Sequence, residues 1–343
     1  MFYPSEWHGD PESLAAEMSA LEAVDPRVEV VIERYLEPED LRSARGRPHD
    51  AALRDLAPPL SDAQRQAFAR VEVAVTVDLP FDVATVAPRL RWVQAVGAGT
   101  GQLQSAGLTD AGIRLTTNGG SNSIGIAEFA FGRLLAVQKR FRELDARQDQ
   151  HRWKAATGKQ VAGQTLGLLG YGPINQAVAA RAAAFGMRIL VTRRTAGVEA
   201  EPPVERFYTV SDLHEMLSAS DAVIAAVPET RETIDLLDRD AFAAMQPGAF
   251  FCNVGRGSLL DEAALIDALQ SGALGAAALD VTRTEPLPPD DPLWDAPNLY
   301  LSPHCSTSGS AMLPKLHRLV RDNLRRYLAG ESLAHEFDPD RGY

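Results

Sequence analysis

Three short motifs in the last quarter of the chain carry side chains of the types that bind anions and transfer protons. They are Asn253-Val254-Gly255-Arg256-Gly257, Asp280 followed by Glu285-Pro286, and Pro303-His304. Arg256 supplies a permanent cation, Glu285 a carboxylate and His304 an imidazole, and these are the groups that reduction of a 2-keto acid needs. Each motif alone is typical of an ordinary loop, so the prediction depends on their order and on what precedes them.

An apolar run that favours a β-strand precedes each motif, at residues 249–252, 276–279 and 299–302. Residues just beyond the carboxyl ends of parallel strands line the crevice where open α/β sheets bind ligands. We therefore expect the three side chains at one edge of a parallel sheet.

A glycine turn between two expected strands indicates a dinucleotide site. The elements are a buried strand (165–170), the turn itself, an Ala-rich helix (176–185) and a second strand (188–192). Gly170 permits a tight turn, and Gly172 lets the backbone approach a pyrophosphate at the amino end of the helix. Pro173 is compatible with the first helical turn. Asn175 stands where the pattern normally has a third glycine, which is its one departure.

The residues after the second strand favour NADP(H) over NAD(H). An NAD-preferring site has an acidic residue about 20 residues past the glycines, which accepts from the ribose 2′-hydroxyl. This chain has Thr192-Arg193-Arg194 instead. Two guanidiniums can clamp a 2′-phosphate, whereas a solvated basic turn is the alternative. We predict NADP(H) as the preferred cofactor, with NAD(H) possible.

The composition is that of an acidic globular protein. The 343 residues suffice for two domains, and 45% are hydrophobic and 23% charged. Lys plus Arg number 34 against 46 Asp plus Glu, a net charge of −12, which gives no general attraction for nucleic acid or anionic lipid. We expect no nucleic-acid partner and no membrane partner.

Cysteine usage and the amino terminus favour a cytoplasmic setting. Cys252 and Cys305 form neither a metal-type pair nor a disulfide framework, so we expect a reducing compartment and no metal. Residues 1–13 are acidic and contain prolines, unlike a signal peptide. No apolar run approaches the roughly 18 residues of a membrane span.

Apolar runs alternate with amphipathic stretches along the chain, a rhythm that predicts an α/β fold with parallel sheets. In the first third we expect a helix at 11–24 and strands at 28–32, 71–77, 92–96 and 113–116. The charged, proline-bearing segment 38–59 is expected on the surface as loop or short helix. A long helix is expected at 123–141, capped by Asn122 or Ser123.

With these motifs the chain resembles the D-isomer-specific 2-hydroxyacid dehydrogenases, and within them the glyoxylate/hydroxypyruvate reductase A type. The resemblance covers roughly residues 90–343 and rests on the motifs above together with Ala127-Glu128, Trp153, Gly163 to Gly167, Val227-Pro228, Thr233, Asp261-Glu262, Ala264-Leu265, Gly275, Leu279 to Val281, Leu287-Pro288, Asp291 to Trp294, Ser302 and Asp340 to Tyr343. It implies two Rossmann-like or flavodoxin-like domains. An NAD(P)-binding domain, 119–305, would be inserted into a discontinuous substrate-binding, catalytic domain, 1–118 and 306–343.

The resemblance implies the same chemistry as the groups themselves. His304 would act as general acid/base paired to Glu285, while Arg256 would bind the carboxylate and carbonyl of the substrate. Backbone N–H groups of Ala98 and Gly99, in the turn 96–100, would hold the other side of the carboxylate. The cofactor contacts would come from Gly170, Gly172, Pro173, Ile174, Thr192, Arg193, Arg194, Val227, Pro228, Thr233, Val254 and, at the nicotinamide end, Asp280.

Three residues depart from the pattern of the family. Thr282 stands where an aromatic residue is usual, Gly101 where Asp is frequent, and Cys305 follows His304 in place of a small apolar residue. These departures alter the walls of the substrate pocket, so the expected substrate is a small-molecule 2-keto or 2-hydroxy acid of unspecified size.

Two other functions share this architecture. A non-catalytic, NAD(P)-sensing or corepressor-like protein would not need Arg256, Glu285 and His304 together. A formate or phosphite dehydrogenase is disfavoured, because the formate enzymes of the family pair the histidine with Gln where this chain has Glu285. The resemblance also suggests a homodimer formed through the cofactor domain and the long helix from Ser123.

Overall fold

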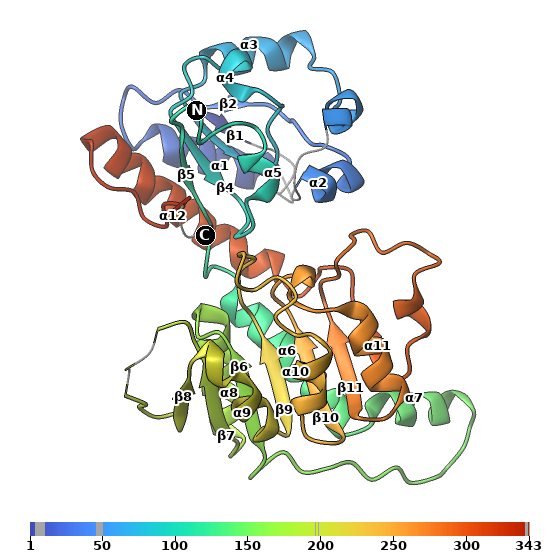
Figure 1. Ribbon diagram of the computed structural model, residues 1–343. Coiled ribbons are helices and arrows are strands. Elements are labelled where there is room, and N and C mark those ends of the chain that lie inside the picture. The colour runs from blue at the N-terminus through green and yellow to red at the C-terminus, as the bar shows by residue number, and fades with distance from the viewer. Residues whose placement is uncertain (4–10, 46–50, 196, 198, 340–341, 343) are drawn as a thin grey trace. The chain divides into compact units, whose positions relative to one another are not determined.

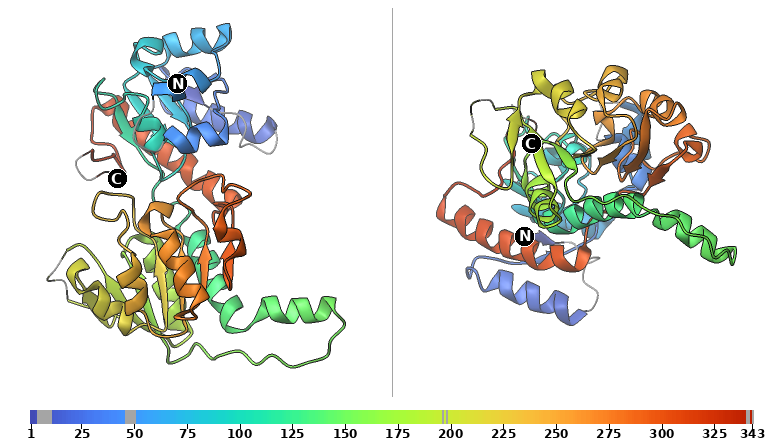
Figure 2. Two further views of the ribbon diagram at one scale, coloured as in Figure 1. Left: turned by 45° about the vertical axis from the view of Figure 1, so that its right-hand side comes forward. Right: turned by 90° about the horizontal axis from the view of Figure 1, so that it is seen from below.

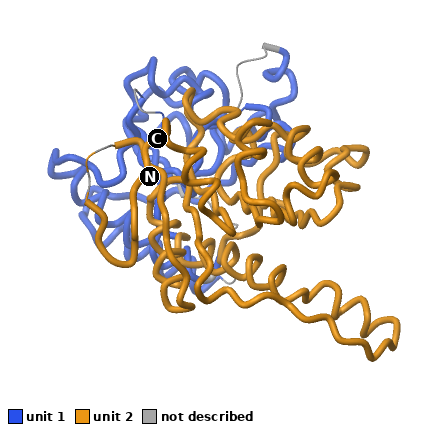
Figure 3. Tube along the Cα trace, turned by 60° about the horizontal axis from the view of Figure 1, so that its bottom comes forward, with its two compact units in different colours: residues 1–121, 309–343 blue, residues 122–308 orange. Residues whose placement is uncertain are grey.

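Two parallel β-sheets organise the chain, one in each of two units (Figure 1). Unit 1 comprises residues 1–121 and 309–343, and unit 2 comprises residues 122–308 (Figure 3). The computed structural model describes residues 1–3, 11–45, 51–195, 197, 199–339 and 342. Both unit boundaries lie three residues beyond the expected 118/119 and 305/306. Residues 4–10 of the amino-terminal segment, and Asp340, Arg341 and Tyr343 of the terminal motif, lie outside the described residues.

Unit 1 has five parallel strands in the order β2-β1-β3-β4-β5, the flavodoxin-like arrangement. The strands are β1 (Phe2–Tyr3), β2 (Val31–Ile32), β3 (Val73–Thr76), β4 (Trp92–Ala95) and β5 (Arg114–Thr116). The helices are α1 (Pro11–Glu22), α2 (Glu39–Arg45), the 3₁₀ helix η1 (Ala51–Leu56), α3 (Asp62–Arg70), α4 (Val83–Val86), α5 (Gly101–Gln104) and α12 (Gly309–Ala329). Residues from α1 and α12 share one core cluster with strand residues such as Val75, whereas α3 and α5 share another with Val93.

Unit 2 has seven parallel strands in the order β12-β11-β10-β9-β6-β7-β8, the doubly wound arrangement. The strands are β6 (Thr165–Leu169), β7 (Arg188–Thr192), β8 (Arg206–Tyr208), β9 (Ala222–Ala225), β10 (Ala249–Asn253), β11 (Leu274–Leu279) and β12 (Leu299–Leu301). The helices are α6 (Ser123–Gln138), α7 (Phe141–Asp149), α8 (Pro173–Ala184), α9 (Leu213–Ser218), α10 (Arg239–Ala244) and α11 (Glu262–Gln270), with 3₁₀ turns η2 (Val210–Asp212), η3 (Gly257–Leu259) and η4 (Pro292–Asp295).

Alternating residues of the unit 2 strands face opposite layers of helices. In β10, Phe250 and Cys252 pack with residues of α6 and α8, while Phe251 between them packs with residues of α9, α10 and α11. All three side chains are buried, as expected for a parallel strand covered on both faces. The predicted fold class, with two parallel α/β domains, is therefore confirmed.

Several local predictions are wrong. The long helix expected at 123–141 ends at Gln138, because Arg140 adopts a left-handed φ of +59° and α7 begins after it. Asn122 is the N-cap of α6, but its side chain makes no capping hydrogen bond. The short helix expected within 38–59 is present as α2 and η1, but the segment is not wholly on the surface, since Leu41 and Arg45 of α2 are each 2% exposed; residues 46–50 lie outside the described residues.

Helix α7 and the segment after it project from the rest of unit 2 (Figures 2 and 3). No residue of α7 is buried. Its Phe141 is 50% exposed and its Leu144 38%, and Trp153 beyond it is fully exposed. Within the described part of the chain, no helix has the length and apolar character needed to cross a membrane.

Candidate active site

The glycine turn joins β6 to α8 and lies against the end of β7. Gly170 has a φ of +85°, and a Cβ placed on it would lie 2.7 Å from Cγ1 of Val227, so both its conformation and its surroundings require glycine. Its N–H donates to the carbonyl of Thr192 at 2.8 Å. The turn therefore adjoins the Thr192-Arg193-Arg194 segment.

Asn175 has a specific structural role at the position where the glycine pattern departs. It is fully buried, and its Nδ2 donates to the carbonyls of Leu169 at 2.9 Å and Gly170 at 2.8 Å. These bonds tie the first turn of α8 to the end of β6. In the usual pattern a third glycine lets the helix pack closely on the strand. Here the hydrogen bonds of Asn175 hold α8 against the end of β6 instead.

The amino end of α8 has the features that bind a pyrophosphate. This helix of 12 residues has Gly172 as its N-cap, and Pro173 and Ile174 open its first turn. A Cβ on Gly172 would meet nothing within 4 Å, so the approach to the free N–H groups is open. Free N–H groups and the helix dipole favour an anion here, and these residues fit a dinucleotide.

Two arginines follow the buried Thr192 at the end of β7. Arg193 is partly buried, with its guanidinium 5.1 Å from the ring centroid of Phe207, and its N–H donates to the carbonyl of Tyr208 at 3.0 Å. Arg194 is exposed. Guanidiniums at this position can bind a phosphate on the adenosine ribose.

The turns after β9 and β10 are packed against each other. A Cβ on Gly255 would lie 2.8 Å from the carbonyl oxygen of Val227. Pro228 is exposed, and its carbonyl accepts from Oγ1 of Thr233 at 2.8 Å, a bond that closes the loop between them. Val254 is buried, at 6% exposure. The turns after β9 and β10 are therefore packed next to the glycine turn, since Val227 lies against both Gly255 and Gly170.

Asn253 shapes the turn that carries Arg256. Its buried amide accepts from the N–H of Gly255 at 3.0 Å and donates to the carbonyl of Arg256 at 2.8 Å. Burial lowers the pKa of Arg256, and the charges of Glu229 and Glu285 oppose that shift. Arginine starts so far above neutrality that Arg256 remains a cation.

Glu285 and His304 form a hydrogen-bonded pair. Nδ1 of His304 lies 2.8 Å from Oε2 of Glu285, and Oε1 of the same carboxylate accepts from the N–H of Thr282 at 3.0 Å. Burial alone would raise the pKa of Glu285, but the hydrogen bond and charge of His304, the Thr282 N–H and the charge of Arg256 together lower it. The carboxylate is thus ionised beside a ring whose side chain is 49% exposed. Nε2 is the ring nitrogen left to reach a substrate.

Asp280 holds the loop that carries His304. Its carboxylate is buried and accepts three hydrogen bonds, from Oγ of Ser302 at 2.8 Å and from the N–H groups of Cys305 and Ser306 at 3.0 Å each. Its carbonyl accepts from the N–H of His304 at 2.8 Å. His304 adopts a left-handed φ of +50°, a costly conformation for a residue with a Cβ, and these bonds maintain it.

Arg256, Glu285 and His304 all follow neighbouring strands. β10, β11 and β12 are adjacent in the sheet, so the expectation that the three motifs meet at one edge is confirmed. Their mutual influence is direct, since Glu285 touches His304 and interacts electrostatically with Arg256.

Ala98 and Gly99 belong to unit 1, in the turn between β4 and α5. Ala98 is exposed and Gly99 partly so. Their N–H groups donate to no other described residue, so both are available to a ligand. The turn is attached to the segment that follows β5, because the carbonyl of Gly97 accepts from the N–H of Asn118 at 3.0 Å.

The three departures from the family pattern lie close to these groups. Thr282 donates its N–H to Glu285 and its hydroxyl to the carbonyl of Thr284 at 2.7 Å. Gly101 begins α5, and Cys305 exposes its thiol while its N–H binds Asp280. Asn253 and Ser302 were named from the sequence as members of motifs, but no role was assigned to either; their hydrogen bonds to the Arg256 turn and to Asp280 appear only in the structure.

Comparison with known proteins gives the family. The family model described as D-isomer specific 2-hydroxyacid dehydrogenase, NAD binding domain, matches residues 131–306. A glyoxylate reductase from Korarchaeum cryptofilum is 35% identical over 265 residues, which cover 75% of this chain and 79% of that protein. A D-3-phosphoglycerate dehydrogenase from Mycobacterium leprae is 33% identical over 274 residues, which are 79% of this chain. The chain spans about half the length of that relative, 51%.

Solved structures of the same family resemble this chain over its whole length. A D-isomer specific 2-hydroxyacid dehydrogenase from Xanthobacter autotrophicus, in complex with NADPH and MES, has a TM-score of 0.76 at 28% identity, covering 100% of this chain and 98% of that one. An NADPH-dependent glyoxylate/hydroxypyruvate reductase from Sinorhizobium meliloti, in complex with NADP and sulfate, has a TM-score of 0.75 at 26% identity with the same coverage. The chain belongs to the D-isomer-specific 2-hydroxyacid dehydrogenase family and contains its NAD-binding domain.

Proposed function

We propose that the protein is a 2-keto acid reductase, that is, a D-2-hydroxyacid dehydrogenase, which prefers NADP(H). The observation that carries the proposal is the contact of 2.8 Å between His304 Nδ1 and Glu285 Oε2, beside a buried turn that presents Arg256. A binding protein without catalysis has no need for an oriented acid next to a cation. The glyoxylate reductases among the relatives support a small 2-keto acid as substrate.

Each residue of the set has a distinct task. NADPH, when bound, supplies the hydride that reduces the carbonyl carbon. Arg256 binds the substrate carboxylate and stabilises the negative charge that grows on the carbonyl oxygen. His304 donates a proton to that oxygen from Nε2, since Glu285 engages Nδ1 and orients the ring. The N–H groups of Ala98 and Gly99 bind the carboxylate.

Turnover tests the proposal directly. We expect NADPH absorbance to decay with glyoxylate, with hydroxypyruvate or with a bulkier 2-keto acid. His304→Ala should then lower kcat by a factor of about 10² to 10⁴, the usual loss for a general acid. His214→Ala, an exposed histidine of α9, is the matched control and should leave kcat unchanged. Tight NADPH binding by the wild type without turnover of any 2-keto acid would favour the NAD(P)-sensing, corepressor-like alternative.

Coenzyme preference depends on the two arginines after β7. Arg193→Ala with Arg194→Ala should lower the ratio of kcat/KM with NADPH to that with NADH by about 10- to 100-fold, because charge-assisted hydrogen bonds to the 2′-phosphate are lost. Arg188→Ala removes an exposed arginine at the start of the same strand, where it pairs with Glu205, and should leave the ratio unchanged. A wild-type preference for NADH would contradict the assignment. The relatives solved with NADPH or NADP support it.

We also propose a cytoplasmic homodimer that associates through the cofactor-binding unit. The long helix expected to form the contact from Ser123 is α6 in the structure, and the proposed contact extends to the projecting α7, whose exposed Phe141 and Leu144 offer apolar surface to a second copy (Figure 2). Light scattering should give twice the mass of the chain, and Phe141→Asp with Leu144→Asp should halve it. A monomeric wild type would contradict the dimer. The two cysteines are free, as suits a reducing compartment.

A further inference from the structure

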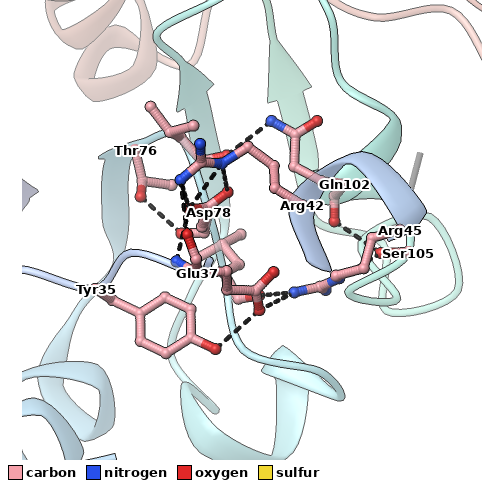
Figure 4. Close-up of polar contacts among 10 residues, drawn as sticks. Tyr35, Glu37, Arg42, Arg45, Thr76, Asp78, Gln102 and Ser105 are labelled. Carbon is pink, nitrogen blue, oxygen red and sulfur yellow. Dashed lines mark hydrogen bonds and ion pairs between the residues drawn. The ribbon is translucent and has the colours of Figure 1, made fainter. Parts of the chain in front are cut away.

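A buried ionic cluster lies at the carboxyl end of β3 in unit 1 (Figure 4). Its charged members are Glu37, Arg42, Arg45 and Asp78. The side chains of Glu37, Arg45 and Asp78 have no exposed surface, and that of Arg42 is 29% exposed. Two cations and two carboxylates balance, so the cluster carries no net charge.

Arg45 is the centre of this cluster. Its Nη1 donates to the carboxylate of Glu37 and, at 2.6 Å, to the carbonyl of Leu79. Its Nε donates to the hydroxyl of Ser105 at 2.8 Å. Its guanidinium also lies 3.8 Å from the ring centroid of Phe81. One side chain therefore joins the segment before α2, the end of β3 and the segment that follows α5.

Asp78 provides the second connection. It accepts from Arg42 with both carboxylate oxygens, at 2.7 to 3.1 Å, and from the N–H of Glu37 at 2.9 Å. The buried Tyr35 hydroxyl donates to Glu37 at 2.9 Å. The chain around residues 35–45 is thus attached to β3 by ionic hydrogen bonds as well as by apolar packing.

The cluster reaches the turn that presents Ala98 and Gly99 through α5. This helix has four residues and begins at Gly101, directly after the turn. Ser105 donates to the carbonyl of Gln102 at 2.8 Å while accepting from Arg45, and Gln102 Nε2 donates to the carbonyl of Val77 at 3.0 Å. A helix of one turn has little stability of its own, so these outside contacts, together with the packing of the buried Leu103 in the core, determine where it lies.

We propose that Arg45 is a positioning residue for the substrate carboxylate: through Ser105 and α5 it fixes the turn 96–100, so that the N–H groups of Ala98 and Gly99 point to one place. This inference rests on the proposed function of the turn. An apolar side chain could fill the same volume, but it could not bind both the carbonyl of Leu79, beyond β3, and the hydroxyl of Ser105, beyond α5. Arg54 shows the contrast, since it lies over the same Phe81 ring at 5.1 Å and pairs with Asp82, yet it is exposed and has no bond to α5.

The test removes both charges of the buried pair together. Arg45→Met alone would leave Glu37 buried without its cation and could prevent folding. The double variant with Glu37→Gln keeps the volume and an acceptor for Tyr35. We expect KM for the 2-keto acid to rise about tenfold while kcat and the Kd for NADPH stay within twofold, because contacts with the carboxylate are equal in ground and transition states. Arg54→Met should change none of these values.

A second measurement separates this inference from the proposed function. Amide hydrogen exchange at residues 98–104 should be faster in the double variant than in the wild type or in Arg54→Met, whether or not the protein turns over a keto acid. Absence of turnover by the wild type would remove the proposed function alone. Unchanged exchange at 98–104, or an unchanged KM in an active enzyme, would overturn the positioning role of Arg45. A loss of thermal stability with an unchanged KM would show a merely structural role.

Discussion

Asp280→Asn tests how the protein holds its proton donor. The carboxylate accepts three hydrogen bonds from residues 302–306, and it is 2% exposed. Asparagine keeps one oxygen, which can still accept from Ser302 and Cys305. It replaces Oδ2 with an amino group that faces the N–H of Ser306, so one charge-assisted bond is lost and two donors face each other.

The expected cost follows from these contacts. A lost hydrogen bond to a charged group and an unpaired buried donor together lower the free energy of unfolding by about 2 to 4 kcal/mol. The loop loosens, and a displacement of about 1 Å of a reacting group can cost about 10²-fold in rate. We therefore expect kcat to fall about 10- to 100-fold, with His304 still present and intact.

Three measurements on Asp280→Asn and the wild type test this prediction: the free energy of unfolding in urea, kcat with saturating 2-keto acid, and the Kd for NADPH. Asp221→Asn is the control, because Asp221 accepts from the N–H of Thr165 at 2.8 Å at the amino end of the same sheet. It should cost about 1 kcal/mol of stability and leave kcat within twofold. An unchanged kcat in Asp280→Asn would refute the reasoning. A Kd for NADPH raised far more than kcat is lowered would instead assign Asp280 to the cofactor.

Two further perturbations address the same site. The pKa of Glu285 is lowered, so its carboxylate stays ionised at neutral pH, and the stability that its pairing contributes is lost only as the pH falls through that lowered value. Glu285→Gln has no carboxylate to titrate, so its free energy of unfolding should fall less than that of the wild type between about pH 6 and about pH 3, measured by urea unfolding at each pH. A Cβ on Gly257 would lie 2.0 Å from the carbonyl carbon of Thr282, so Gly257→Ala should lower the free energy of unfolding in urea by about 3 kcal/mol. The control is Gly132→Ala on α6, where a Cβ meets nothing within 4 Å and the free energy of unfolding should not fall. A Gly257→Ala protein as stable as the wild type would show that the turn at Gly257 is not packed against the turn at Thr282.

Features with a local cause were predictable from the sequence. The strand expected at 188–192 coincides with β7 (Arg188–Thr192), because an apolar run between turn residues is a local signal. The position of the three motifs at the carboxyl ends of β10, β11 and β12 was predictable for the same reason. Ligands bind at the carboxyl ends of parallel strands, and this rule requires only that the strands be located in the sequence.

Features that depend on distant partners were not predictable. Arg45 looks like a solvated residue in a charged segment, yet its partner Ser105 lies 60 residues away, and Asp78 lies 36 residues from Arg42. In the sequence, Asn175 is only a departure from the glycine pattern of dinucleotide sites. Its structural role could not be predicted, because its hydrogen bonds to Leu169 and Gly170 form only when β6 and α8 are folded together. Pairing of buried polar groups is decided by the fold, and composition alone does not reveal it.

The order of strands in unit 2 has a consequence for how the enzyme can change. The arginines that would select the coenzyme follow β7, the reacting groups follow β10 to β12, and β6 and β9 stand between β7 and β10. With about 4.8 Å between strands, the two sets lie about 14 Å apart, beyond the range at which substitutions usually couple. A double-mutant cycle between Arg193→Ala and Glu285→Gln should therefore show a coupling free energy below about 0.5 kcal/mol. Coenzyme choice and carbonyl reduction can then be altered independently, each on its own flank of one sheet.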